Sequence, residues 1–228
     1  MTIIRVFDFF FRGFIILGTF ILIVNNFKKI KKNRFINDNK ETIKYYNSLW
    51  QKIFPYFTYL SSVLIGLSLF RIGSLLQVYD TGLIQLKFWG YVILDNADIE
   101  RFKIPIIIIG CIGAISYLFF CIVQNLSFVA LGEHFSTNID IKEEHKLITK
   151  DIYGVIRHPI YLSEFMLPFA ASLALQSWVL FLWAIVVILP VTIKKAKMED
   201  ELLEHYFQKE FLSYKSNVGG FFPFFKKR

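Results

Sequence analysis

Residues 153–165 read YGVIRHPIYLSEF and place an arginine, a histidine and a proline in a row, directly before a long apolar run that reaches Ile193. Hydrophobic residues make up 55% of the 228-residue chain, and aromatic residues make up 18%. This composition is far more apolar than that of a water-soluble domain of the same size. The sequence therefore predicts an integral membrane protein with a polar cluster at the edge of one of its spans.

Five stretches approach or meet the length of roughly 20 apolar residues that a helix needs to cross the hydrocarbon core. They are Ile3–Asn26, Ile53–Gln77, Ile104–Leu131, Ile160–Gln176 and Trp178–Ile193. The expected fold class is all-α, a multi-pass transmembrane helical bundle of about five spans. A sixth apolar run, Gly82–Leu94, is too short to span and carries Lys87, so we interpret it as interfacial or re-entrant.

The last two spans follow each other almost without a break, which predicts a tight C-terminal helical hairpin. One very long helix is the alternative. Pro168 and Pro190 argue against that alternative, because each proline removes a backbone donor and bends a helix.

The formal net charge of +8 is concentrated in particular loops. Lysines and arginines fill the loop between the first two spans, and basic loops stay in the cytoplasm. Counting spans from there places the N-terminus outside and the C-terminus in the cytoplasm. The polar stretches Asn138–Pro159 and Lys194–Phe221 then both lie on the cytoplasmic side, where the hairpin brings them together. This distribution argues for a membrane surface and against a nucleic-acid partner.

Other features of the sequence narrow the interpretation. Cys111 and Cys121 both lie in the third span, and we expect lipid-facing or packed thiols, since neither a disulfide framework nor a metal-ligand spacing is present. The first span resembles the apolar core of a signal peptide, but it is long and ends in a basic cluster, so we expect a retained anchor. With no internal repeat, residues 1–228 are expected to form a single integral-membrane domain.

The arginine, histidine and proline of the opening stretch have a conformational consequence. Pro159 is placed near the first turn of a helix, where its missing N–H does no harm, and it favours an extended His158. A helix start also presents free N–H groups and a positive dipole end, which suits an anionic group. Taken singly, Arg157 could instead be a snorkelling anchor, and Tyr153 and Tyr161 could belong to an aromatic belt.

The second polar stretch, residues 194–214, reads KKAKMEDELLEHYFQKEFLSY. Lys195 and Glu199 are four residues apart, so on a helix they would share a face and form an ion pair at a solvated helix end. Apolar and aromatic residues then recur at helical spacing, which predicts an amphipathic helix lying on the lipid headgroups. These residues are Leu203, Tyr206, Phe207, Phe211 and Tyr214.

The order of these motifs resembles the C-terminal half of the isoprenylcysteine carboxyl methyltransferases and related integral-membrane methyltransferases. The matching motifs are His-x-Leu-Ile-Thr at residues 145–149, Arg-His-Pro-x-Tyr at 157–161, the acidic pair at 199–200 and a final proline at 223. The resemblance covers about residues 131–223. It implies a methyltransferase core in residues 131–228, preceded by N-terminal spans in residues 1–130.

The resemblance implies S-adenosyl-L-methionine as the cofactor, bound in a cytoplasmic pocket between the polar loop and the last helix. By position, the cofactor-binding residues would be His145, Lys146, Leu147, Ile148, Tyr153, His158, Pro159, Ile160, Tyr161 and Glu199. The catalytic residues on the substrate side would be Arg157 and Lys195.

Several residues depart from the family pattern. Asp151, Ser163 and Gln208 stand where glycine is usual, Asp200 replaces a glutamate and Phe211 replaces a tyrosine. Lys195 stands where the family places an arginine for the substrate. Lysine lacks the bidentate fork that arginine offers to a carboxylate, so this change bears on the identity of the substrate.

The expected reaction is methyl transfer from S-adenosyl-L-methionine to a lipophilic acceptor, like that of the protein-S-isoprenylcysteine O-methyltransferases. The first candidate is the carboxylate of a prenylcysteine-like substrate, which needs no general base, so alignment and exclusion of water would carry catalysis. A phospholipid amine or another amphiphile is the alternative, with His145 or Glu164 as a base. The partners are then a lipophilic or prenylated substrate and membrane lipids, without a metal or nucleic acid.

Two further classes of function stay open on the sequence. One is a membrane oxidoreductase resembling the sterol reductases, which would use a nicotinamide cofactor. The other is a non-catalytic membrane subunit that binds lipid.

Overall fold

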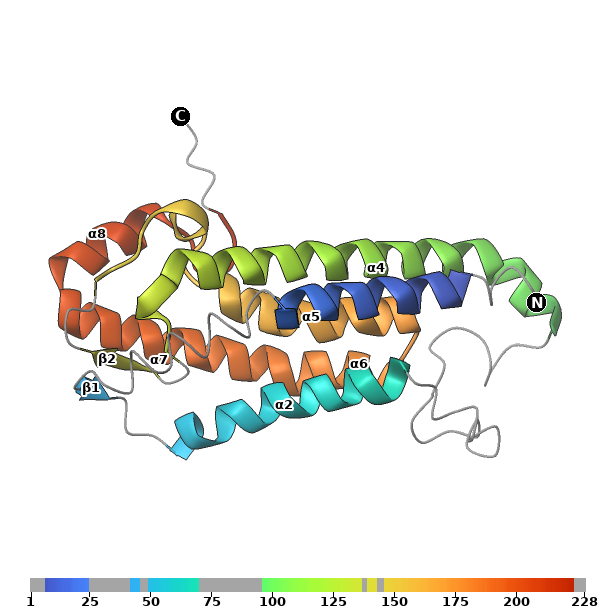
Figure 1. Cartoon of the computed structure of the whole chain (residues 1–228), viewed down its shortest axis with the longest axis horizontal. Coiled ribbons are helices and arrows are strands. Elements are labelled where there is room, and N and C mark those ends of the chain that lie inside the picture. The colour runs from blue at the N-terminus through green and yellow to red at the C-terminus, as the bar shows by residue number, and fades with distance from the viewer. Residues whose placement is uncertain are drawn as a thin grey trace. The chain divides into compact units, whose positions relative to one another are not determined.

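The computed structural model describes residues 7–24, 42–45, 49–69, 96–136, 139–142 and 146–223 (Figure 1). The α-helices are Phe7–Val24, α2 (Leu49–Leu69), α4 (Asn96–Leu131), α5 (Pro159–Leu175), α6 (Trp178–Leu182), α7 (Leu189–Phe207) and α8 (Lys209–Asn217). The shorter elements are the 3-10 turns η1 (Gly132–His134) and η2 (Asp151–Gly154), and the π-helical segment η3 (Trp183–Ile188). Two strands, β1 (Thr42–Tyr45) and β2 (Asp140–Lys142), pair in antiparallel fashion.

The helices confirm the predicted all-α membrane fold. Four helical segments are long and apolar enough to cross a membrane, namely Phe7–Val24, Lys52–Leu69, Ile107–Leu131 and Val179–Phe207. The fourth predicted span is the shorter apolar helix α5, with 17 residues. The Gly82–Leu94 run and most of the basic loop between the first two predicted spans lie outside the described residues.

The predicted helical hairpin is confirmed, but the reason given for it is wrong. The chain turns at Gln176, which has a φ of 54°, and Ser177 caps α6 by accepting a hydrogen bond from the Leu180 N–H. Pro168 lies inside α5 and Pro190 near the start of α7, and neither ends its helix. The turn therefore comes from a left-handed residue followed by a serine cap, a local geometry that ends one helix and begins another.

The helical run after the turn is longer than predicted. It begins at Trp178, as expected, but passes through η3 into α7 and ends only at Phe207. Lys195, Glu199 and Asp200 therefore stand on the same continuous run of helix as the last apolar span. A helix holds side chains more firmly than a loop, which suits residues of a functional site.

The described chain divides into two compact units, and each is described by itself. The first comprises residues 1–20, 56–121 and 165–189. In it the Thr19 and Tyr117 hydroxyls are hydrogen-bonded at 2.8 Å, and the Arg12 guanidinium pairs with Asp8 and donates to the Leu69 carbonyl at the end of α2. Arg12 therefore neutralises the charge of Asp8 and also donates a hydrogen bond to a carbonyl that the end of α2 leaves without a partner in the helix.

The second unit comprises residues 21–55, 122–164 and 190–228, and it contains both polar stretches that the sequence predicts to meet. β1 and β2 belong to this unit, with Tyr45 opposite Asp140. The division into an N-terminal part, residues 1–130, and a core, residues 131–228, stays a prediction.

Gly113 provides a test of the packing in the first unit. A Cβ at this position would overlap the Ala174 backbone nitrogen and the Ala170 carbonyl oxygen, whereas a Cβ at Gly66 meets nothing nearby. Gly113→Ala should therefore lower the free energy of unfolding by about 1–3 kcal/mol through overpacking, and the thermal midpoint in detergent should fall with it. Gly66→Ala should raise it, because alanine is the better helix former by about 1 kcal/mol. Equal midpoints for the two variants would contradict the packing of α4 on α5.

Candidate functional site

The loop before α5 is held by a short 3-10 turn and by one tyrosine of α8. Residues 151–154 form η2, which buries the Tyr153 side chain. The Tyr214 hydroxyl donates a hydrogen bond of 2.6 Å to the Tyr153 carbonyl. Burial raises the pKa of the Tyr153 phenol, so its hydroxyl stays protonated at neutral pH.

The loop then pairs with the chain that follows α8. Ile156 forms a parallel bridge with Gly219, the Arg157 N–H donates to the Gly219 carbonyl at 2.8 Å, and the His158 N–H donates to the Gly220 carbonyl at 3.0 Å. Pro159 follows as the first residue of α5, as predicted. The backbone donor of His158 is thus satisfied by the chain itself rather than left for a ligand.

The His158 ring lies between two carboxylates of α7. Its Nδ1 is 3.1 Å from a Glu199 oxygen and its Nε2 is 2.9 Å from an Asp200 oxygen. Burial lowers the pKa of the imidazole, but the hydrogen bonds to Asp200 and Glu199 and the charges of both raise it above its ordinary value. The ring is therefore expected to be an imidazolium that donates from both nitrogens.

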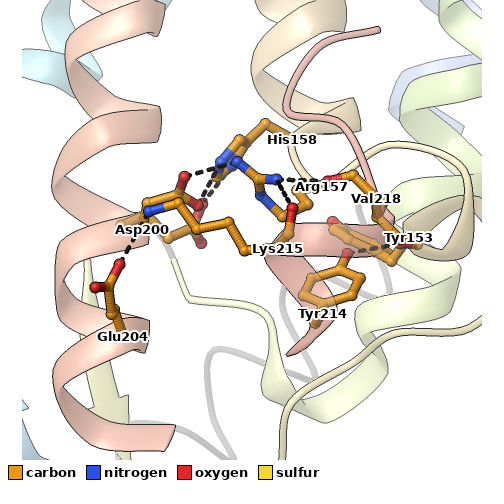
Figure 2. Close-up of polar contacts among 9 residues, drawn as sticks. Tyr153, Arg157, His158, Asp200, Glu204, Tyr214, Lys215 and Val218 are labelled. Atoms are coloured by element: carbon orange, nitrogen blue, oxygen red, sulfur yellow. Dashed lines mark hydrogen bonds and ion pairs between the residues drawn. The ribbon is translucent and has the colours of Figure 1, made fainter. Parts of the chain in front are cut away.

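Arg157 ties the same carboxylate to the end of α8. Figure 2 shows its guanidinium between the α7 carboxylate and the chain that ends α8. One nitrogen forms an ion pair of 2.9 Å with Asp200, and another donates to the carbonyls of Lys215 and Val218. Its Nε is buried without a hydrogen-bond partner in the described part of the chain. Arg157 thus shapes the site, because it joins α7 to the C-terminal segment, the stretch of chain at residues 215–220.

Lys195 has a different partner from the one predicted. Its ammonium lies 2.9 and 3.2 Å from the two carboxylate oxygens of Glu164, and 4.8 Å from the centre of the Tyr161 ring. Glu199 pairs with His158 instead, so the prediction of a Lys195–Glu199 pair along the helix is wrong. Glu164 of α5 is a site residue that the family pattern does not identify.

The Tyr161 ring joins the two groups of charges. It stacks on the His158 ring, with centroids 5.6 Å apart and an angle of 19° between planes, and it also lies under the Lys195 ammonium. The Tyr161 ring therefore contacts both His158, which is expected to bind the cofactor, and Lys195, which is expected on the substrate side.

The aromatic residues that follow α7 form a core instead of a lipid-facing stripe. Phe211 is fully buried and packs with Tyr214 and Val218, and three partly buried residues complete the cluster, namely Leu147, Leu203 and Phe207. The expected headgroup helix is thus folded back: α8 begins after Gln208 and packs on α7 and on the loop. This packing also accounts for a phenyl ring at Phe211, since a hydroxyl there would be buried among apolar atoms.

The structure gathers part of the predicted cofactor set. His158, Pro159, Tyr161 and Glu199 come together with Arg157, and Tyr153 lies on the same loop under Tyr214. Leu147 packs against the α8 cluster, Lys146 is exposed, and Ile148 and Ile160 are half-buried. His145 lies outside the described residues. Asp200, which the sequence marks only as the second residue of an acidic pair, turns out to hold both His158 and Arg157.

Two of the departures from glycine fall where the backbone favours glycine. Asp151 has a φ of 54° and Gln208 a φ of 47°, both in the left-handed range. Aspartate tolerates this range better than most residues, whereas glutamine has no such local compensation. The third departure, Ser163, is fully buried in α5, and its hydroxyl donates to the Pro159 carbonyl at 2.9 Å.

The chemistry offered by this arrangement is electrostatic. Carboxylates, an imidazolium and tyrosines converge at the junction of α5, α7 and the loop, and in the described residues no group of three histidines, cysteines or acids could hold a metal ion. Glu199 is the accessible member, since its side chain is 37% exposed while that of His158 is 3% exposed. A cationic ligand could approach Glu199 without disturbing His158.

Comparison with protein families identifies the same part of the chain. Residues 108–210 match the model of a family described as phospholipid methyltransferase. No curated protein gives a significant match. The family match confirms the resemblance to integral-membrane methyltransferases of the isoprenylcysteine carboxyl methyltransferase type, and it includes the loop, the hairpin and α7.

Gln208 provides a test of the backbone at the α7–α8 junction. Gln208→Gly should stabilise the protein by about 1 kcal/mol, because glycine relieves the left-handed conformation. Gln208→Val should destabilise it, because a β-branched side chain tolerates this range least. Thermal unfolding in detergent measures both, with Lys209→Gly as a control that should destabilise the first turn of α8. A destabilising Gln208→Gly would contradict this backbone geometry.

Proposed function

We propose that this membrane methyltransferase transfers a methyl group from S-adenosyl-L-methionine to the headgroup of a lipophilic acceptor, at the junction of α5, α7 and the loop before α5. The observation that carries the proposal is the meeting of His158 with Glu199, which are 41 residues apart in sequence and 3.1 Å apart in space. Both belong to the motifs that the resemblance assigns to the cofactor.

The residues at this junction fit such a cofactor. S-adenosyl-L-methionine carries a positive sulfonium, an ammonium group and several hydrogen-bonding groups. The accessible carboxylate of Glu199 suits a positive charge, and the protonated hydroxyl of Tyr153 can donate a hydrogen bond. The proposed cofactor-binding residues are those predicted from the resemblance, namely His145, Lys146, Leu147, Ile148 and Tyr153 of the loop, His158, Pro159, Ile160 and Tyr161 around the α5 start, and Glu199 of α7.

Each charged residue has a separate role in the proposal. When bound, the sulfonium supplies a methyl group that is already electrophilic. His158 is buried and fixes the orientation of Glu199, while Arg157 positions Asp200 and the chain after α8. These residues align the reactants and exclude water, so the rate enhancement is expected to come from proximity and preorganised charge.

The choice of acceptor depends on Lys195. A prenylcysteine carboxylate would need a free cation, but the Lys195 ammonium is already held by both oxygens of Glu164. A phospholipid amine does not need that cation, and the matched family is described as phospholipid methyltransferase. We therefore favour an amine headgroup, with the prenylcysteine carboxylate as the second candidate. Transfer to the amine would require the ammonium first to give up one proton to water. The nitrogen–carbon bond then forms as the carbon–sulfur bond breaks, and neutral S-adenosylhomocysteine leaves.

We further propose that this site faces the cytoplasm and that the N-terminus lies outside. The basic loop between the first two predicted spans carries β1, and the loop after α4 carries β2. Since paired strands lie on one side of a membrane, their pairing supports the placement of both loops on the same, basic side.

Binding of S-adenosylhomocysteine by calorimetry tests the site assignment. Glu199→Ala and His158→Ala should each weaken binding by about tenfold or more, while expression and thermal midpoint remain high enough to measure. Glu210→Ala and His205→Ala, which change exposed residues of the same types, are the matched controls and should bind normally. Normal binding in both site variants would contradict the assignment.

A radiolabelled methyl-transfer assay tests the reaction. Wild-type protein should label phosphatidylethanolamine in preference to farnesyl-cysteine. Binding of NADPH in place of S-adenosylhomocysteine would instead favour a membrane reductase, and labelling of farnesyl-cysteine alone would reverse the order of the two acceptors.

A further inference from the structure

The Lys195 ammonium lies in surroundings that are typical of a cation-binding site. Both carboxylate oxygens of Glu164 are within 3.2 Å of its nitrogen, the Tyr161 ring centre is 4.8 Å away and the Phe54 ring centre is 5.6 Å away. The lysine and glutamate side chains are only 11% and 15% exposed. A carboxylate combined with aromatic rings is the set of groups that proteins use to hold ammonium ligands.

The groups around this nitrogen come from different elements of the second unit. Tyr161 and Glu164 are one turn apart on α5 and share a face, Phe54 belongs to α2, and Lys195 to α7. Tyr161, Glu164 and Phe54 surround one position, and the Lys195 ammonium occupies it. Lysine is suited to a removable occupant, because its ammonium is a point charge on a flexible four-carbon stem.

We propose that Glu164, Tyr161 and Phe54 form the binding site for the ammonium of a zwitterionic acceptor lipid, and that the Lys195 ammonium holds this position until the acceptor displaces it. This inference rests on the proposed function, because it names the residues that recognise the acceptor of that reaction. It assigns Glu164 and Lys195 to specificity rather than to methyl transfer itself.

Charge balance explains why the occupant is needed. A buried carboxylate without a partner is strongly destabilising, so Glu164 requires a cation whenever no acceptor is bound. A phosphoethanolamine headgroup carries one positive and one negative charge. Its ammonium can replace Lys195 at Glu164, and its phosphate can pair with the displaced Lys195, so every charge keeps a partner. A prenylcysteine carboxylate would bring only a negative charge and would leave Glu164 unpaired.

The position of the site agrees with transfer from the proposed cofactor residues. The Tyr161 ring that lies under the Lys195 nitrogen also stacks on His158, which bonds Glu199. An acceptor nitrogen in the place of the lysine nitrogen is therefore separated from the proposed cofactor-binding residues by no more than one aromatic side chain.

Native mass spectrometry with short-chain phosphatidylethanolamine tests the role of Glu164. Glu164→Gln should weaken lipid binding by about tenfold or more, since it removes the negative charge that the ammonium needs. Binding of S-adenosylhomocysteine, measured by calorimetry, should stay within about twofold of wild type. Lys194→Met, which changes the exposed neighbouring lysine above Trp50, is the matched control and should alter neither affinity. Unchanged lipid binding in Glu164→Gln would overturn the proposal.

Dodecylamine, a cation without a phosphate, tests whether Lys195 is a displaceable occupant. Lys195→Met should bind dodecylamine more tightly than wild type, because the competing ammonium is gone. Weaker binding, as in Glu164→Gln, would show that the lysine is not a competitor and would overturn that part of the proposal.

A double variant keeps the test decisive if a single variant fails to fold. Glu164→Gln with Lys195→Met leaves no unpaired charge, so the protein should fold and bind S-adenosylhomocysteine, but it should lose phosphatidylethanolamine. Retention of the lipid would overturn the proposal. Failure of the wild type to bind S-adenosylhomocysteine would instead contradict the proposed function, whatever the lipid measurements show.

Discussion

The His158 ring, held between Glu199 and Asp200, is the interaction on which the rest of the site depends. Two neighbouring carboxylates on one helix repel each other, and the expected imidazolium between them offsets that repulsion, because both of its nitrogens lie within hydrogen-bond distance of a carboxylate oxygen. Arg157 takes the second oxygen of Asp200 and donates to the carbonyls of Lys215, near the end of α8, and of Val218, directly after it. The loop, α7 and the C-terminal segment are thereby fixed to one another through one pair of acids.

The charges of this site occur as balanced pairs, which a chain of such apolar composition requires. Glu164, Glu199 and Asp200 face Lys195, His158 and Arg157, so three negative groups meet three positive ones when the His158 ring is protonated. Buried ion pairs contribute little net stability compared with apolar packing, yet the loss of one partner is costly. These ion pairs instead fix the position of each charged side chain. A charged ligand must therefore bind where it can replace one partner of a pair, and it must carry the charge of the partner that it replaces.

The sequence predicts the helices and the hairpin because these depend on local pattern, and Pro159 predicts the start of α5 for the same reason. The order of the elements also predicts that the loop before α5 lies near α7, because a helical hairpin returns the chain to the side of the membrane from which it started. The individual partners were not predictable. Helical spacing suggests Lys195 with Glu199, but their actual partners are 31 and 41 residues away, and only the packing of α5 on α7 selects them.

An experimental structure of the protein with bound S-adenosylhomocysteine tests the central claim most directly. The account predicts one ligand in contact with the loop at Tyr153, with the start of α5 at His158 and with Glu199 of α7, while His158 still bonds Asp200. A ligand bound elsewhere, or in contact with the loop alone while Glu199 faces away from it, would contradict the account.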